Sequence, residues 1–98
     1  MNPVLIVEDN AFFLQFLKEI LHSRFPSMDI LEAGNGDEAM QKIKILPPSA
    51  IFMDLRLPGE NGLELARRIK TDYPDITVII FTSHNFPEYR EAAIRYKA

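Results

Sequence analysis

The sequence predicts an α/β domain built on a parallel sheet, and three observations support this prediction. Short apolar runs alternate with stretches in which apolar residues recur every three or four positions, as in strands that alternate with helices. Three of these runs are almost continuously hydrophobic, which is typical of strands that helices cover on both faces. The chain has 98 residues, a length that corresponds to one domain.

Four segments have the composition of strands, and they span residues 4–7, 28–33, 50–53 and 78–81. Their β-branched and aromatic residues favour extended backbone. The second segment contains Asp29 and Glu32, and this polar content predicts a strand at the edge of the sheet. Because helices join the strands in parallel, the carboxyl ends of the strands should open onto one common edge.

Four helices are predicted to follow these strands. The first begins after Asn10, a residue type that caps helices well, and its expected core-facing residues are Phe12, Phe13, Phe16, Leu17, Ile20 and Leu21. The second covers about residues 37–46, and its expected buried residues are Ala39, Ile43 and Leu46. The third starts at Asn61, ends near Pro74, and is expected to bury Leu65, Ala66 and Ile69. The fourth starts at Asn85 and places on one face Tyr89, Ala92, Ala93 and Tyr96.

Composition and charge exclude several classes of protein. The chain has no cysteine, which rules out a disulfide scaffold, a thiolate metal site and thiol chemistry. Its formal net charge is −3, so we expect no direct contact with nucleic acid. No apolar run approaches the roughly 20 residues of a membrane span, and the start lacks the basic flank of a signal peptide. We therefore expect a cytoplasmic, soluble domain.

Acidic and hydroxyl residues follow three of the predicted strands. Glu8 and Asp9 follow the first strand, Asp54 follows the third, and Thr82 follows the fourth. Since the strands open onto one edge, we expect these side chains to lie close together. Three converging carboxylates repel one another unless a cation lies between them, and ligation by carboxylates and water suits Mg²⁺.

Each of these residues alone has a plainer interpretation. Acids after a strand often mark only the start of a helix, and a threonine at a strand end is commonly structural. Their shared position at one edge favours a functional site. A divalent ion beside carboxylates suits phosphoryl chemistry, in which one carboxylate attacks in line and a neighbouring hydroxyl donates to a phosphoryl oxygen.

Three segments, taken in order, resemble the response-regulator receiver domain of two-component signalling. They are residues 4–10 (VLIVEDN), 54–62 (DLRLPGENG) and 78–83 (VIIFTS). The middle segment matches the family block Asp-x-x-[Leu/Met]-Pro-x-x-[Asn/Asp]-Gly without a gap. The resemblance covers the whole chain and implies a flavodoxin-like, three-layer α/β fold with a parallel sheet of strand order 2-1-3-4.

The resemblance implies a phospho-acceptor and a metal site. Asp54 would accept a phosphoryl group from a sensor histidine kinase, a histidine phosphotransfer protein or a small phosphodonor. Glu8 and Asp9 would hold Mg²⁺ (or Mn²⁺) together with Asp54, and the backbone carbonyl of Arg56 would be a further ligand. The domain would be a regulatory phospho-acceptor and not an enzyme.

The resemblance also implies a switch on the neighbouring strand. Thr82 would contact the phosphoryl group and couple its arrival to the loop and helix that follow. His84 would lie at the mouth of the pocket, and its position and that of Arg56 would influence the lifetime of the phosphorylated state. Ser83 would also modulate the site.

The family pattern continues beyond residue 98 with a fifth strand, a pocket lysine and a fifth helix. We therefore expect residues 1–98 to form a receiver domain that is incomplete at its C-terminus. Lys97, near the end of the fourth predicted helix, does not replace the missing lysine, so phosphorylation should be impaired. The fourth strand should be an exposed apolar edge through which copies of the chain associate with one another.

Two other functions remain open from the residues themselves. The first is a protein-interaction module that has the shape of a receiver and works without phosphorylation. The second is a small metal-dependent phosphohydrolase. This second function is disfavoured because Arg56 stands two residues after Asp54, where a second acid would be needed as general acid or base.

Overall fold

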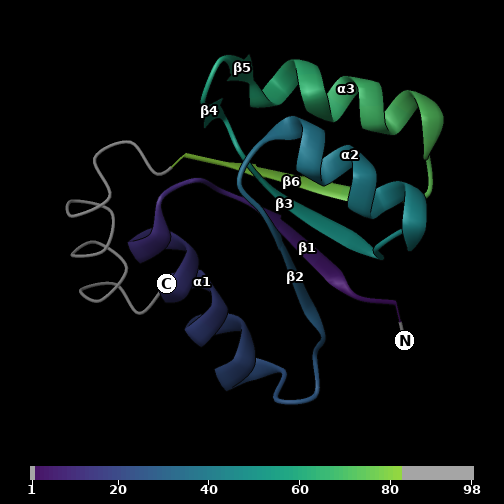
Figure 1. The fold of residues 1–98 in the computed structure, drawn as a ribbon. Coiled ribbons are helices and arrows are strands. Elements are labelled where there is room, and N and C mark those ends of the chain that lie inside the picture. Colours follow the sequence, from purple (N-terminus) through teal and green to yellow (C-terminus); the bar gives the residue numbers. More distant parts are fainter. Residues whose placement is uncertain (1, 83–98) are drawn as a thin grey trace.

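The computed structural model describes residues 2–82, which form a four-stranded parallel sheet of order β2-β1-β3-β6. These strands are β1 (Val4–Val7), β2 (Ile30–Ala33), β3 (Ala50–Asp54) and β6 (Thr77–Phe81). The helices are α1 (Ala11–Arg24), α2 (Gly36–Ile45) and α3 (Gly62–Asp72). Helix α1 covers one face of the sheet, and α2 and α3 cover the other (Figure 1). The predicted flavodoxin-like fold and its strand order are confirmed.

Strand β1 lies at the centre of the core. It pairs with β2 on one side and with β3 on the other, and all four of its residues are buried. A strand covered on both faces is expected to be continuously apolar, as this one is. The largest buried cluster lies between the sheet and the two helices α2 and α3, and contains Leu5, Val7, Ala33, Ala39, Ile43, Ile51, Met53, Leu57, Leu65, Ile69 and Ile76.

Several predicted boundaries need correction. Strand β2 starts at Ile30 and not at Met28, whose amide donates to the Phe25 carbonyl in the preceding turn. Strand β3 includes Asp54 and β6 includes Thr77. A short antiparallel hairpin, β4 (Arg56–Leu57) with β5 (Glu60–Asn61), stands between β3 and α3 and was not predicted, because two-residue strands show no periodicity.

The predicted core face of α2 and α3 is confirmed at five positions and wrong at one. Ala39, Ile43, Leu65, Ala66 and Ile69 are buried. Leu46 is 48% exposed because α2 ends at Ile45, so that Leu46 is the C-cap residue, directly before the two prolines, and does not belong to the buried face of the helix.

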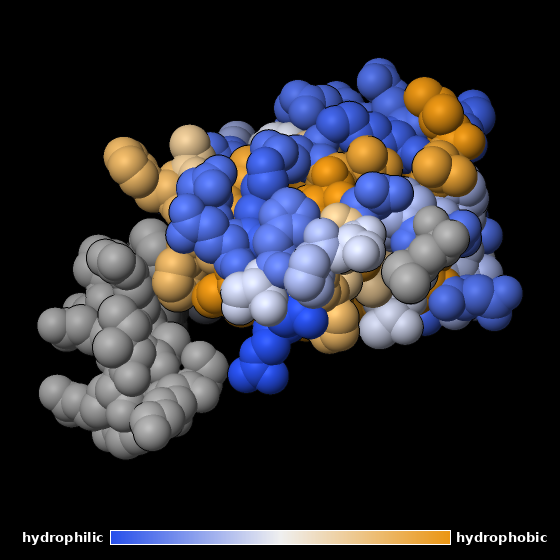
Figure 2. All heavy atoms as spheres, turned by 90° about the horizontal axis from the view of Figure 1, so that it is seen from below, coloured by the Kyte–Doolittle hydropathy of each residue, from blue (hydrophilic) through white to orange (hydrophobic). Residues whose placement is uncertain are grey.

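The predicted core face of α1 is too wide. Leu21 is buried and Phe13 stacks on Phe81 with ring centroids 5.0 Å apart, but Phe12 is 83% exposed and Ile20 40% exposed. Six apolar residues span more of the helix circumference than one contact with the sheet can bury. Seen from the α1 side, the molecule shows apolar surface in several places between hydrophilic side chains (Figure 2). The fourth predicted helix lies outside the described residues.

The two edges of the described sheet differ in character. At β2, Lys18 forms an ion pair with the Glu32 side chain at 2.7 Å, and the Lys42 ammonium donates to the Glu32 carbonyl. Strand β6 carries no charge, and Ile79 and Ile80 are 40% and 38% exposed. Lysines are a common means of blocking an edge strand against further pairing. Within residues 2–82, therefore, β2 is a protected edge and β6 an open one.

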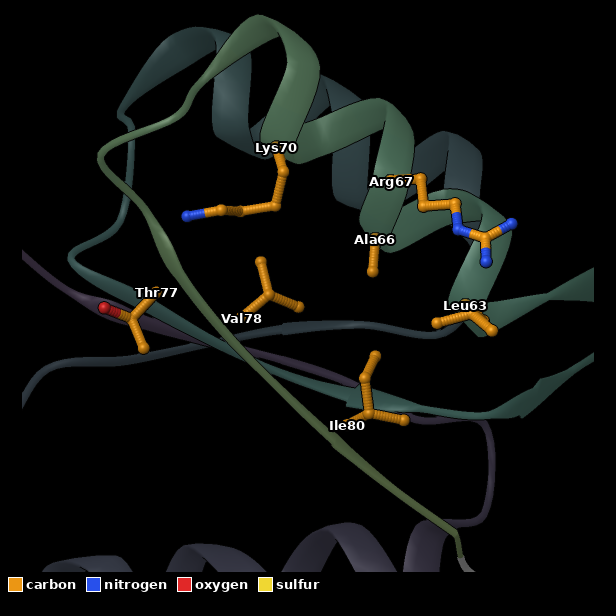
Figure 3. Close-up of a pocket in the computed structure, with 7 residues that line it drawn as sticks. All are labelled: Leu63, Ala66, Arg67, Lys70, Thr77, Val78 and Ile80. Atoms are coloured by element: carbon orange, nitrogen blue, oxygen red, sulfur yellow. The ribbon is translucent and has the colours of Figure 1, made fainter.

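Strand β6 also borders an open groove beneath α3 (Figure 3). Its volume is about 400 Å³, and its lining residues are Leu63, Ala66, Arg67, Lys70, Thr77, Val78 and Ile80. Val78 and Ile80 point from β6 toward the helix. Among residues 2–82, no helix combines the length and the apolar composition that crossing a membrane requires.

Candidate functional site

The carboxyl ends of β1 and β3 bring three acidic residues together. Glu8 follows β1 directly, Asp54 is the last residue of β3, and the pairing of Val7 with Met53 places these strand ends side by side. Glu8, Asp9 and Asp54 each offer a carboxylate oxygen, and these oxygens lie within 4.8 Å of one another. The residues that the sequence places at one edge of the sheet therefore form one cluster, although they come from distant parts of the chain.

Two of the three acids are deeply buried. Glu8 is 2% exposed and Asp54 is fully buried, whereas Asp9 is exposed. Burial raises the pKa of the Glu8 carboxyl from its ordinary value of 4.5 to about 8, and a hydrogen bond with Asp54 and the charges of the other two acids act in the same direction. At neutral pH, Glu8 therefore holds a proton when no cation is nearby.

Backbone amides hold the two buried carboxylates in place. The amide of Asn10 donates to Glu8 Oε1 at 2.8 Å, while the Asn10 side chain caps α1 by accepting from the Phe13 amide. The amide of Arg56 donates to Asp54 Oδ1 at 3.1 Å. The turn into α1 and the turn into β4 thus fix the direction of both side chains.

Thr82 follows β6 at the same edge. Phe81, the residue before it, is the register partner of Asp54, and the Phe81 carbonyl accepts from the Leu55 amide at 2.7 Å. Thr82 is half-buried. Ser83 and His84 lie outside the described residues.

The donor set of this cluster fits a hard divalent cation. All three side chains offer oxygen, the atom that Mg²⁺ and Mn²⁺ prefer, and Asp9 keeps one side of the cluster open to water. Burial is the main cause of the raised pKa of Glu8, and the charges of Asp54 and Asp9, which a cation would offset, raise it further. Glu8, Asp9 and Asp54 are therefore suited to hold such an ion.

The sequence profile of the family described as the response regulator receiver domain matches residues 4–98. The chain belongs to this receiver-domain family. Over 97 residues it is 35% identical to the protein-glutamate methylesterase/protein-glutamine glutaminase of Geobacillus kaustophilus, and the match covers 97% of this chain and 28% of that protein. The resemblance seen in the three sequence segments is thereby confirmed.

Solved response regulators share the fold of this receiver domain. TrrA of Thermotoga maritima, in complex with Mg²⁺ and BeF, is 31% identical with a TM-score of 0.76, covering 85% of this chain and 70% of that one. TrrA in complex with the histidine kinase ThkA gives a TM-score of 0.75 at the same identity and coverage. The receiver domain spans 28%, 38% and 41% of three of the curated relatives that it matches, less than half of each.

The sequence gives little warning of one structural feature of the site, the packing of Gly62 on the acceptor strand. Gly62 is buried, and its amide donates to the Leu55 carbonyl at 2.8 Å. One sequence signal is the final glycine of the family block at residues 54–62, which the resemblance assigns, with Pro58, to shaping the loop after Asp54. A second signal is a repeated Asn-Gly pair at residues 35–36 and 61–62, each of which begins a helix. That pair identifies a helix start but does not indicate what the glycine contacts.

Proposed function

We propose that this receiver domain is a phosphorelay switch that accepts a phosphoryl group on Asp54. The observation that carries the proposal is the buried Asp54 carboxylate within 4.8 Å of the Glu8 and Asp9 carboxylates, at the end of β3. A carboxylate in that position is shielded from bulk water and lies beside the groups suited to a divalent cation. The family match over residues 4–98 supports the same function.

The proposed transfer requires only one bond to form and one to break. An oxygen of the Asp54 side chain attacks phosphorus in line, a P–O bond forms, and the P–N bond of a phosphohistidine breaks with its electron pair returning to the imidazole nitrogen. The donor would be a sensor histidine kinase or a histidine phosphotransfer protein, in keeping with the complex of TrrA and ThkA.

We assign Mg²⁺ (or Mn²⁺) to the acidic cluster. Glu8, Asp9, Asp54 and the backbone carbonyl of Arg56 would hold the ion, which when bound offsets the negative charge of the incoming phosphate. The complex of TrrA with Mg²⁺ and BeF supports this assignment. Glu8 must release its proton for the ion to bind, so binding should strengthen as the pH rises toward 8.

Thr82 would carry the signal away from the site. The acyl phosphate adds about −1.5 to −2 units of charge, as estimated from phosphorylated hydroxyls, and the Thr82 hydroxyl would donate to one of its oxygens. This contact would bias the segment that follows β6, in which Ser83 and His84 would modulate the lifetime of the phosphate. In this role the domain is a regulatory acceptor and not an enzyme with turnover, and it would act in the cytoplasm.

We also propose that copies of the 98-residue chain associate through β6. This strand has an apolar sequence of high strand propensity, and Ile79 and Ile80 are both partly exposed. The opposite edge, β2, is blocked by the contacts of Lys18 and Lys42 with Glu32. If copies pair along one edge, β6 is therefore the favoured one.

The phosphoryl-acceptor proposal is tested with acetyl phosphate or phosphoramidate as the donor. We expect the wild-type chain with Mg²⁺ to gain the mass of one phosphoryl group, measured on the intact protein, and Asp54→Asn to gain none. Asp72→Asn, at an exposed acid on the last turn of α3, is the control and should react like the wild type.

Two results would contradict the proposal. No mass gain and no response to beryllofluoride with Mg²⁺ would favour an interaction module that works without phosphorylation. Steady release of phosphate from a phosphate ester would favour a phosphohydrolase.

A further inference from the structure

The first residue of α3 lies directly against the backbone of the proposed acceptor. An ideal Cβ placed on Gly62 would lie 2.9 Å from the Asp54 carbonyl carbon and from Leu55 Cα, and closer still to the Asp54 carbonyl oxygen. Non-bonded carbon atoms normally approach to about 3.5 Å. Because these neighbouring atoms belong to the backbone, no side chain fits at Gly62 unless the end of β3 moves.

A second glycine occupies the equivalent place in α2 without this constraint. Gly36, like Gly62, is the first residue of its helix, is buried, and follows an asparagine cap. The three atoms nearest to a Cβ on Gly36 all belong to the carboxylate of Glu60, which is the far end of a flexible side chain. A third glycine, Gly59, has a positive φ of 65° and open space around its Cβ position. Only Gly62 combines a helix start with contact to the acceptor backbone among these three.

We propose that Gly62 is a positioning residue for Asp54. By allowing α3 to close on the Asp54 carbonyl, Gly62 sets where the Asp54 side chain leaves β3 and therefore where its carboxylate lies relative to Glu8 and Asp9. The Asp54 carboxylate is then fixed from two sides, at its main chain by α3 and at Oδ1 by the Arg56 amide. This inference rests on the proposed function, since it concerns the residue that accepts the phosphoryl group.

The test compares Gly62→Ala with Gly36→Ala in the 98-residue chain. Circular dichroism identifies a temperature at which both variants are folded, and all binding and rate measurements are made there. A displacement of a reacting group by about 1 Å can lower the reaction rate about 100-fold. Loss of a contact that holds a metal ligand in place can weaken metal binding about 10-fold. We therefore expect Gly62→Ala to be phosphorylated by phosphoramidate about 100-fold more slowly, and to bind Mg²⁺ alone about 10-fold more weakly, than the wild type.

Gly36→Ala should keep the phosphorylation rate and the Mg²⁺ affinity of the wild type, even if it is destabilised as much as Gly62→Ala. The Mg²⁺ affinity, measured by NMR titration without a phosphodonor, separates positioning from stability, because folded chains with an undisturbed Asp54 should bind alike. A folded Gly62→Ala with wild-type affinity and rate would overturn the inference while leaving the proposed function intact. A wild-type chain that neither binds Mg²⁺ nor is phosphorylated would overturn both.

A measurement on the wild type decides the matter if Gly62→Ala does not fold. The chain has four glycines, so their amide signals can be followed separately in an ¹⁵N NMR spectrum. On adding beryllofluoride with Mg²⁺, we expect the amide signals of Arg56 and Gly62 to shift and that of Gly36 to stay. If Arg56 shifts while Gly62 does not, α3 is not coupled to the acceptor and the inference is wrong.

Discussion

The buried Glu8 carboxyl carries an electrostatic cost in this receiver domain. Burial, more than the charges of Asp54 and Asp9, raises the pKa of this carboxyl, and the hydrogen bond from the Asn10 amide acts in the opposite direction. A neutral residue in place of Glu8 would relieve this cost and at the same time remove a potential cation ligand. The residue is therefore better explained by cation binding than by stability.

The pH dependence of stability provides a test of this cost. The Glu8 carboxyl has a pKa of about 8 in the folded chain, against an ordinary value of 4.5. At a pH between these two values, Glu8 therefore holds a proton in the folded chain and has released it in the unfolded chain. The free energy of unfolding should therefore fall as the pH rises between these values and level off above about 8. We expect Glu8→Gln to remove this contribution, so that urea denaturation without divalent cations shows a flatter pH profile than in the wild type.

The matched control for this prediction is Glu19→Gln, at an exposed acid on α1. It should keep the wild-type profile. If the free energy of unfolding depends on pH equally in the wild type and in Glu8→Gln, the Glu8 carboxyl does not cause this pH dependence.

The three helices described between residues 2 and 82 share one starting device, which is an asparagine cap. Asn10, Asn35 and Asn61 each accept a hydrogen bond from an amide in the first turn of α1, α2 and α3. In α1 the cap Asn10 directly follows Asp9, and in α3 the cap Asn61 directly precedes Gly62, which lies against the Asp54 backbone. The starts of α1 and α3 and the candidate site therefore depend on the same short turns after β1 and β3. Parallel α/β sheets bind their ligands at such turns, beyond the carboxyl ends of the strands.

Asn35 allows the energetic value of a cap to be measured away from the site. Its Oδ1 accepts from the Glu38 amide at 2.9 Å, so Asn35→Ala should lower the free energy of unfolding by about 1 kcal/mol, because it leaves that amide without its partner. Asn35→Asp keeps an acceptor at the helix start and should stay within about 0.5 kcal/mol of the wild type. Urea denaturation of the three proteins measures both differences. If Asn35→Ala and Asn35→Asp are equally stable, the cap does not contribute in this way.

At the scale of the whole molecule, the sequence predicts what depends on apolar pattern and chain order. The buried run of β1 and the apolar stripe of α3 mark their elements clearly, and the rule that parallel strands end at one edge brings Glu8 and Asp54 together. Pattern alone does not reveal how much surface is available for burial, so it places the exposed Phe12 in the core. Nor does it reveal close backbone approach, which depends on how finished elements pack, as at Gly62.

The open edge at β6 leads to a prediction about the assembly of the 98-residue chain. Pairing along β6 would cover Ile79 and Ile80 and add a partner at the edge that β6 forms among residues 2–82, so sedimentation velocity at about 100 μM should show a dimer. Ile79→Lys, which introduces a charge at that edge, should shift the chain to a monomer while circular dichroism confirms that it is folded. Ile45→Lys is the control, because Ile45 is 84% exposed on α2, away from β6, and it should leave the dimer intact. A monomeric wild-type chain, or equal dissociation of both variants, would rule out β6 as the interface.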